Sequence, residues 1–188
     1  MLKSSIIALG LSVITAFIPF AAQADGHDAD VTDEGDQVIT LTFTSAEGLG
    51  ATVGTVTLTD TEYGLLLIPD LSGLPAGAHG FHIHTNPDCG PAKKNGKIVP
   101  GLAAGGHFDP FNTGSHEGPY SEEGHLGDLP PLFVEADGTA TIPVLAPRLE
   151  TAFIHGRSLM VHLHGDNFSD DPAPLGGGGA RLACGIIE

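Results

Sequence analysis

The sequence has few basic residues, and this scarcity narrows the possible partners of the protein. Among 188 residues there are seven Lys and Arg against 23 Asp and Glu, which gives a formal net charge of −16 with His neutral. A chain of this charge has little to attract a phosphate backbone or an anionic lipid surface. We therefore expect neither nucleic acid nor a membrane among the partners of the mature protein.

Sustained helical patterns and reactive-serine motifs are also missing. No window keeps apolar residues at the three- and four-residue spacing of an amphipathic helix, so we expect little helix. No serine stands in a G-x-S-x-G sequence, which argues against a hydrolase of the Ser-His-Asp type. The first absence favours an all-β domain, and the second means that any catalytic activity depends on residues other than a reactive serine.

The first 24 residues have the organisation of a secretory signal peptide. Lys3 provides a positive start, residues 6–22 form an apolar run, and residues 22–24 (Ala-Gln-Ala) are a small-x-small cleavage pattern. An uncleaved membrane anchor is the alternative, and Pro19 and the cleavage pattern argue against it. We predict that residues 1–24 are removed on export.

Cleavage after residue 24 would leave a strongly acidic chain with two cysteines. Loss of Lys3 leaves six basic residues against 23 acidic ones, a formal charge of −17. Cys89 and Cys184 form an even pair in an oxidising compartment, so we predict a disulfide between them. It would close a loop of about 95 residues, which the chain-entropy model values at about 4–5 kcal/mol.

Short apolar or β-branched runs between Gly and Asp residues predict strands along the chain. We expect them at residues 38–45, 51–60, 63–69, 79–84, 136–144 (around a turn at Asp137-Gly138), 158–164 and 182–187. Residues 25–37 are acidic and poor in apolar side chains, which predicts a flexible N-terminal segment. The predicted fold is one all-β domain over residues 38–188, a Greek-key β-barrel or sandwich. Two long loops, 86–130 and 165–180, interrupt it, and loops of this length are usually functional or disordered.

The sequence HGFHIH places two histidines on one side of an extended segment. In a strand, His82 and His84 project to one face, while Phe81 and Ile83 project to the other. His162 in the later sequence SLMVH can join them in an all-nitrogen site, which is typical of Cu(II) or Zn. We favour copper because a redox metal would give the site a reaction to catalyse.

The first long loop holds a second set of metal-binding residue types. His107 stands in GGHFDP, His116 in TGSHEGP, and His125 and Asp128 in EEGHLGDLP. Three imidazoles and one carboxylate can make a closed tetrahedral site for a structural zinc that orders the loop. A lone loop histidine is usually only solvated, but this combination predicts a metal site.

Five motifs in order carry a resemblance to a known family. HGFHIH, GGHFDP, HLGDLP, GRSLMVH and GGGGARLACGI resemble the copper-zinc superoxide dismutases over most of residues 38–188, and the short run from His84 to Cys89 is similar to their bacterial exported branch. The resemblance implies a periplasmic enzyme, with an extracellular location as the alternative. Its reaction would be dismutation of superoxide to dioxygen and hydrogen peroxide by alternating reduction and oxidation of a histidine-bound copper.

The resemblance also implies the metal ligands and two further site residues. One copper would be held by His82, His84, His107 and His162, and one structural zinc by His107, His116, His125 and Asp128. His107 would then bridge both metals, release copper in the reduced state and carry a proton. Arg181 would guide the anionic substrate to copper, and Asp166 would link His82 to His116 and fix the orientation of both rings.

Two hypotheses rest on residues outside the motifs. Lys93, Lys94 and Lys97 cluster after Cys89 and could form a positive funnel with Arg181, although a solvated lysine-rich loop is an equal alternative. If cleavage falls after Ala24, the mature chain begins Asp25-Gly26-His27, whose amine, amides and imidazole could wrap Cu(II) in a square plane. The alternative is an accidental histidine in an acidic tail.

Three histidines have no ligand role in this interpretation. His79 is expected to be a structural hydrogen-bonding residue, His155 has no assigned role, and His164 is expected at the rim of the site. The alternative function is a copper-binding or copper-delivery module on the same fold without turnover, which the presence of Arg181 argues against. A copper-only relative would lack the zinc residues, and an adhesive sandwich would not need the histidines. The sequence leaves open whether the protein is a monomer or a homodimer.

Overall fold

The structure is a computed structural model that describes residues 36–188. The predicted signal peptide and nearly all of the acidic segment 25–37 lie outside the described residues. Within residues 36–188 the chain forms eleven strands, one four-residue helix and two short 3-10 helices, so the all-β prediction is confirmed. No helix in this range is long and apolar enough to cross a membrane.

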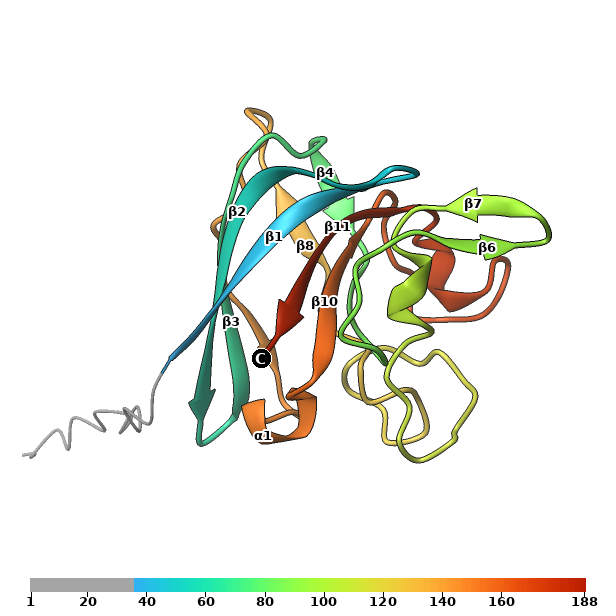
Figure 1. Ribbon diagram of the computed structural model, residues 1–188. Coiled ribbons are helices and arrows are strands. Elements are labelled where there is room, and N and C mark those ends of the chain that lie inside the picture. The colour runs from blue at the N-terminus through green and yellow to red at the C-terminus, as the bar shows by residue number, and fades with distance from the viewer. Residues whose placement is uncertain (1–35) are drawn as a thin grey trace, which may run out of the picture.

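Seven strands form one curled antiparallel sheet that encloses the core (Figure 1). Their spatial order is β5 (Phe81–His84), β10 (Arg157–His162), β11 (Arg181–Ile187), β1 (Gln37–Ser45), β2 (Gly48–Thr61), β3 (Gly64–Leu71) and β9 (Val144–Ala146). Two strand pairs lie outside this sheet: β4 (Gly77–His79) with β8 (Leu132–Val134), and β6 (Ala92–Lys94) with β7 (Lys97–Val99). The helices are η1 (Leu102–Ala104), α1 (Thr151–Ile154) and η2 (Leu175–Gly177).

An irregularity between β1 and β2 shows how the sheet curls. Leu41 pairs with Gly54 and Thr42 with Thr52, so β2 has one extra residue at this point. Gly54 has a φ of 137°, and a Cβ there would overlap the carbonyl oxygen of Asp70 on β3. A bulge of this kind bends the strand and increases its twist, and glycine permits the close approach of the neighbouring backbone.

The core follows the two-residue period of the strands. In β3 Leu65, Leu67 and Leu71 are buried at alternate positions, and they pack in one cluster with side chains of β1, β2 and β11. Phe81 and Ile83 of β5 belong to the same cluster, as their alternation with His82 and His84 predicts. The apolar face of β5 therefore fixes the direction in which its two histidines point.

The predicted strand at 136–144 is wrong. β8 ends at Val134 and β9 begins at Val144, and only an isolated bridge from Ala140 to Leu71 lies between them. Asp137 accepts hydrogen bonds from the backbone N–H and the hydroxyl of Thr139, and Pro143 has no N–H to donate to a ladder. The turn satisfies its own polar groups, so it does not continue the sheet.

The long loop 86–130 contains a hairpin where the sequence analysis expects no strand. β6 and β7 pair across Asn95 and Gly96, whose φ angles of 52° and 78° are those of a type I′ turn. The Asn-Gly pair is the signal that could have revealed the hairpin. Lys93, Lys94 and Lys97 are exposed on this hairpin.

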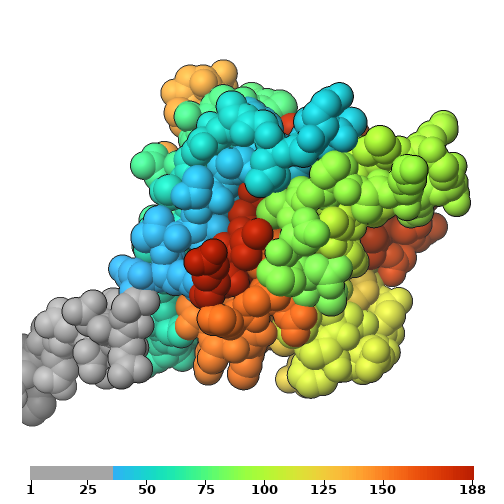
Figure 2. Space-filling model, in the orientation of Figure 1, coloured from blue at the N-terminus to red at the C-terminus, as the bar shows by residue number. Residues whose placement is uncertain are grey.

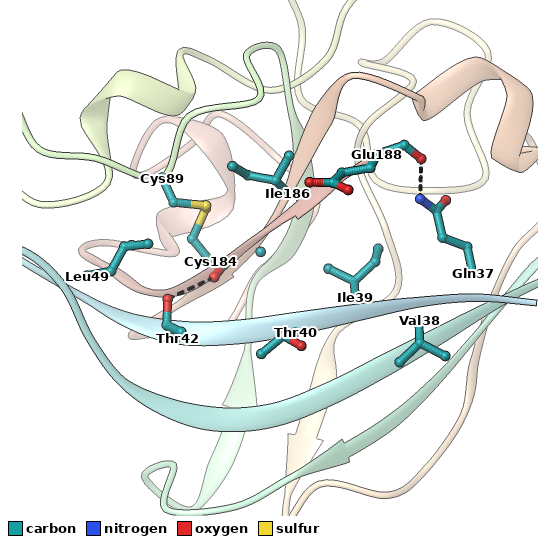
Figure 3. Close-up of a pocket in the computed structure, with 11 residues that line it drawn as sticks. Gln37, Val38, Ile39, Thr40, Thr42, Leu49, Cys89, Cys184, Ile186 and Glu188 are labelled. Atoms are coloured by element: carbon teal, nitrogen blue, oxygen red, sulfur yellow. Dashed lines mark hydrogen bonds between the residues drawn. A yellow bond between two sulfur atoms is a disulfide. The ribbon is translucent and has the colours of Figure 1, made fainter.

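The predicted disulfide between Cys89 and Cys184 is present and joins the first long loop to β11 (Figure 3). Both cysteines are buried, and their Cα atoms are 5.7 Å apart. In the hollow beside the bond, the hydroxyl of Thr42 on β1 donates to the carbonyl of Cys184 at 3.5 Å. In Figure 2 the C-terminal residues form a red patch between the blue first strand and the green loop. The bond thus holds this loop against the last strand.

Candidate metal centre

Buried histidines and aspartates from separate segments meet beside β5. Two groups have potential ligand atoms that all lie within 4.8 Å of one another: His82, His84, His107 and His162, and then His82, His107, His116 and Asp128. Every member is buried. Such a concentration of imidazole and carboxylate is costly unless the groups are paired or bind a metal.

Strand pairing brings the members of the first group together. β5 and β10 are neighbours, with His82 opposite Met160 and His84 opposite Ser158, and His162 ends β10. Nε2 of His84 lies 3.2 Å from Nε2 of His162. His84 also forms an isolated bridge with His107, which brings the loop histidine to the same place.

His107 lies between the two groups. Its ring stacks on that of His82 with centroids 3.9 Å apart, and its Nδ1 is 2.9 Å from Oδ1 of Asp128. Its Nε2 is buried and has no hydrogen-bond partner among the described residues. The two nitrogens of one imidazole therefore face opposite sides of the centre.

The loop residues converge around Asp128. Nδ1 of His116 is 2.9 Å from Oδ2 of Asp128, and Nδ1 of His125 is 3.4 Å from Oδ1. Both nitrogens and Oδ2 nevertheless make no hydrogen bond of acceptable geometry within residues 36–188. Unpaired buried acceptors that face a common point fit a tetrahedral zinc site made of imidazole and carboxylate.

The predicted zinc residues differ from the second distance-defined group in one member. That group contains His82 and not His125, because the ring of His82 lies against that of His107. His125 is nevertheless close, with its ring centroid 5.4 Å from that of His107 and 6.0 Å from that of His116.

Asp166 connects the two groups through their outer nitrogens. Its Oδ2 is 2.7 Å from Nε2 of His82, and its Oδ1 is 2.8 Å from Nε2 of His116. An imidazole that donates one N–H to a carboxylate presents a lone pair at its other nitrogen. When the rings are neutral, Nδ1 of each is therefore left to bind a metal, and both Nδ1 atoms are buried without a hydrogen bond of acceptable geometry among the described residues. At Gly176 the φ is 68° and a Cβ would overlap Oδ1 of Asp166, so glycine is required there.

Burial sets the charge of the copper-side histidines. It lowers the pKa of His82, and it lowers the pKa values of His84 and His162 further because neighbouring imidazoles add repulsion. Burial, together with the charge of His82, lowers the pKa of His107 to about 3. These rings are neutral at pH 7, as metal ligands must be.

The aspartates reverse this effect on the loop side. Burial alone would lower the pKa of His116, but contacts with Asp128 and Asp166 raise it to about 9. Burial would raise the pKa values of both carboxyls, yet their histidine contacts hold them well below the usual range. Without metal, the loop side of the centre therefore holds a proton between two carboxylates at neutral pH.

Arg181 stands where the centre opens to solvent. Its Nη1 donates to the carbonyl of Gly101 at 2.6 Å, and its Nη2 donates to the carbonyl of Gly105. The same Gly105 oxygen lies 3.0 Å from Nδ1 of His84. Neither carbonyl was predicted, because every residue has a backbone oxygen and its identity does not mark it as functional. The glycine-rich sequence GLAAGGH is the available signal, since it suggests close backbone approach.

A hollow of about 280 Å³ leads to this end of the centre. Its lining includes His162, Arg181 and Lys94, together with Pro174 and Leu175 of the second long loop. Lys93 and Lys97 are exposed on the hairpin but are not among the lining residues. The structure therefore brings one of the three predicted lysines to the opening.

The other predicted histidines lie outside the centre. His79 is buried, with Nδ1 at 2.8 Å from the carbonyl of His162 and Nε2 at 2.7 Å from the carbonyl of Pro75. His155 follows α1 and His164 follows β10, and both are exposed. The N-terminal sequence Asp25-Gly26-His27 lies outside the described residues.

Comparison with known proteins gives consistent matches. Residues 52–187 match the family model described as "Copper/zinc superoxide dismutase (SODC)". "Superoxide dismutase [Cu-Zn] 1" of Salmonella typhimurium is 58% identical over 144 residues, 76% of this chain and 81% of the relative. "Superoxide dismutase [Cu-Zn]" of Haemophilus parainfluenzae is 49% identical over 191 residues and covers 100% of both chains. The solved "Cu/Zn superoxide dismutase from Brucella abortus" has a TM-score of 0.80 at 51% identity, covering 82% of this chain and 100% of that one.

Proposed function

Because this chain belongs to the copper/zinc superoxide dismutase family, we propose that its two buried groups are the copper and zinc sites of one catalytic centre. The protein is an oxidoreductase that dismutates superoxide, and its cofactors are copper and zinc. The single observation that carries the residue-level proposal is the environment of the two nitrogens of His107: Nδ1 lies 2.9 Å from Oδ1 of Asp128, and Nε2 is buried without a hydrogen-bond partner among the described residues. His82 also belongs to both groups, but its Nε2 contacts Asp166, so it has one nitrogen left for a metal.

The ligand assignment follows from which nitrogens are free. His82, His84, His107 and His162 would hold copper, while His107, His116, His125 and Asp128 would hold zinc. His82 can bind only one of the two metals, because its Nε2 is committed to Asp166 and only Nδ1 is left. Its place on β5 with His84, opposite β10, supports the copper side. His125 takes the remaining zinc position because its Nδ1 is buried, unpaired and 3.4 Å from Asp128.

His107 would contribute one ring nitrogen to each metal site, and it can carry a proton. When bound, copper supplies a one-electron couple that oxidises one superoxide and reduces the next, and zinc supplies a fixed positive charge on the loop side. Formation of hydrogen peroxide consumes two protons, and Nε2 of His107 is the buried nitrogen that can hold one of them. Nδ1 lies beside Asp128 on the zinc side, so the ring can keep its orientation while Nε2 gains or loses a proton.

Arg181 and Lys94 receive the anionic substrate. Arg181 is held by two carbonyls and shares the hollow with the copper ligand His162, so its charge lies at the entrance to the reacting metal. Lys94 lines the same hollow, and Lys93 and Lys97 add positive potential from the hairpin. Local positive charge can steer an anion to its site although the whole chain is acidic.

The direct test is the dismutation rate of the disulfide-bonded protein with copper and zinc quantified in the same sample. We expect about 10⁸ to 10⁹ M⁻¹s⁻¹, the range of diffusion-limited enzymes. Absence of turnover with both metals bound would favour the alternative, a copper-binding or copper-delivery module on this fold.

The exported state of the mature protein is a further part of the proposal. The similarity to bacterial enzymes and the pattern of residues 1–24 support a cleaved signal peptide and a periplasmic location, with a barrel domain over residues 38–188. Mass spectrometry of the mature chain tests the cleavage site. A start at Asp25 would leave the Asp25-Gly26-His27 copper site possible, and any other start would exclude it.

Sedimentation of the mature protein distinguishes a monomer from a homodimer.

A further inference from the structure

The residues assigned to zinc lie on a segment that has little regular structure of its own. Between η1 and β8 the chain forms turns and bends, with isolated bridges at His107 and Asp128. His116 is held from outside the segment twice: Asp166 contacts its ring, and Asp170 accepts its backbone N–H at 2.9 Å. The ring of His125 has no comparable carboxylate partner beyond Asp128 in the described part of the chain.

We propose that Arg148 is the positioning residue that fixes His125 in the zinc site. Arg148 lies between β9 and α1 and is partly buried. Its Nη2 donates to the carbonyls of Gly124 at 3.1 Å and His125 at 3.0 Å, and its Nη1 donates to the carbonyl of Ser121. One guanidinium thus holds three carbonyls of a single turn, a task suited to a planar group with several fixed donors.

The contacts of His125 explain why this clamp sets the position of its ring. Its N–H donates to the carbonyl of Ser115 at 3.0 Å, while its carbonyl accepts from Arg148. Both sides of the residue are therefore fixed through the backbone. Asp166 holds the ring of His116 by a side-chain contact, and Arg148 achieves the same result for His125 through the main chain.

The clamp is anchored in the barrel itself. Leu149, the next residue, is buried in the main core, and its N–H donates to the carbonyl of Ala146 at the end of β9. Gly124 packs closely against the segment before it, since a Cβ there would lie 2.7 Å from Cβ of Glu117. The turn at 121–125 is thus held between the barrel and the rest of its own loop.

Arg148 could act through its hydrogen bonds to three carbonyls or through its positive charge alone, and these two explanations predict different results for the same variants. Asp128 and Glu122 both interact with the positive charge of Arg148. If charge alone matters, Arg148→Lys should behave as the wild type, and Glu122→Gln should alter the site. If the hydrogen bonds matter, Arg148→Lys should fail because an ammonium cannot reproduce the planar arrangement of donors, and Glu122→Gln should be neutral.

The experiment uses full-length mature protein, disulfide intact and stripped of metal, with wild type, Arg148→Gln, Arg148→Lys and Glu122→Gln in parallel. Cobalt(II) is the spectroscopic probe, because its visible absorption reports tetrahedral coordination, and zinc affinity is measured by competition with a chelator. We expect both Arg148 variants to bind zinc about 10- to 100-fold more weakly, the usual effect of losing a group that orients a ligand. Their cobalt spectra should change, while Glu122→Gln matches the wild type.

Two results would overturn the role of Arg148. One is wild-type zinc affinity and cobalt spectrum in both Arg148 variants. The other is a lowered melting temperature of the metal-free variants with an unchanged cobalt spectrum in the folded protein, which would make Arg148 a merely structural residue. Because the inference rests on the proposed zinc assignment, the wild type is the internal check: absence of a tetrahedral cobalt spectrum there would reject that assignment itself. Arg148→Lys keeps the test usable if Arg148→Gln fails to fold.

Discussion

Oδ2 of Asp166 lies 2.7 Å from Nε2 of His82, and both side chains are completely inaccessible to solvent. The other oxygen of the same carboxylate lies 2.8 Å from Nε2 of His116. One aspartate therefore sets the orientation of a ring in each of the two proposed metal sites, so a change at Asp166 affects both at once.

Asp166→Asn should weaken both metal sites. An amide has one acceptor oxygen, so it cannot accept from both rings, and we expect metal affinity to fall about 10- to 100-fold. Chelator competition for copper and zinc measures the change, with Asp171→Asn, an exposed carboxyl of the same loop, as the control. Unchanged affinity for both metals would show that the rings do not need this carboxylate.

His107→Ala should abolish dismutation and disturb both sites. The imidazole belongs to both ligand groups, so its loss removes one nitrogen from each. Metal content, the copper absorption spectrum and the dismutation rate are measured together, and the exposed His164→Ala serves as the control. Normal turnover in His107→Ala would contradict the bridging assignment.

Arg181→Gln should slow the reaction and weaken its dependence on salt. Loss of the positive charge in the hollow is expected to lower the second-order rate on the order of tenfold, since steering contributes from 10 to 10³. Lys94→Gln should have a smaller effect in the same direction, and Lys93→Gln, outside the lining, the smallest. The rate is measured over a range of ionic strength. If replacement of all three lysines by Gln leaves rate and salt dependence unchanged, the funnel hypothesis is wrong.

The metal-free protein should lose stability as the pH rises from about 6.5 to about 9. The folded state raises the pKa of His116 from 6.5 to about 9, so it binds this proton more tightly than the unfolded chain does. The resulting stabilisation is complete below pH 6.5 and is lost as the pH rises through 9. Urea unfolding of chelated, disulfide-bonded protein measures it, and zinc-loaded protein should lack this loss because zinc replaces the proton. A flat profile in the metal-free protein would contradict the prediction.

Replacement of both cysteines by serine should lower the free energy of unfolding by about 2–5 kcal/mol. It should also slow dismutation, because the loop after Cys89 supplies the carbonyls of Gly101 and Gly105 that hold Arg181. Urea unfolding of the metal-loaded double variant gives the first quantity and rate measurement the second. Loss of stability with an unchanged rate would show that the loop keeps its conformation without the bond.

Most strands of the main sheet were predictable from composition. Short apolar or β-branched runs between turn residues predicted the strands that became β1, β2, β3, β10 and β11, and alternation predicted the two faces of β5. The turn at Asp137-Gly138 was predictable, but the strand expected around it is absent before Val144, because Asp137 accepts the N–H of Thr139 within the turn. The β6–β7 hairpin was missed although Asn95-Gly96 signals it, because its strands have three residues each.

The proposed site was predictable to the extent that it depends on side-chain identity. His82 and His84 follow from strand geometry alone, and the loop histidines follow from residue type and glycine context. The contacts that position these residues were not predictable. Gly101, Gly105 and His125 act through carbonyl oxygens, which every residue has. Arg148 donates to His125, which is 23 residues away in the sequence, so no local sequence pattern marks this contact.

The segment that carries the loop histidines also occupies the open side of β5, one of the two edge strands of the seven-stranded sheet. The N–H of Ile83 donates to the carbonyl of Gly127 at 2.9 Å, and the carbonyl of Ile83 accepts from Phe108 at 2.8 Å. A sheet edge left bare is a template for strands of other molecules and hence for aggregation. We therefore expect that a change that disorders this segment, such as loss of the metal ligands on it, also exposes the edge of β5 to pairing with other molecules.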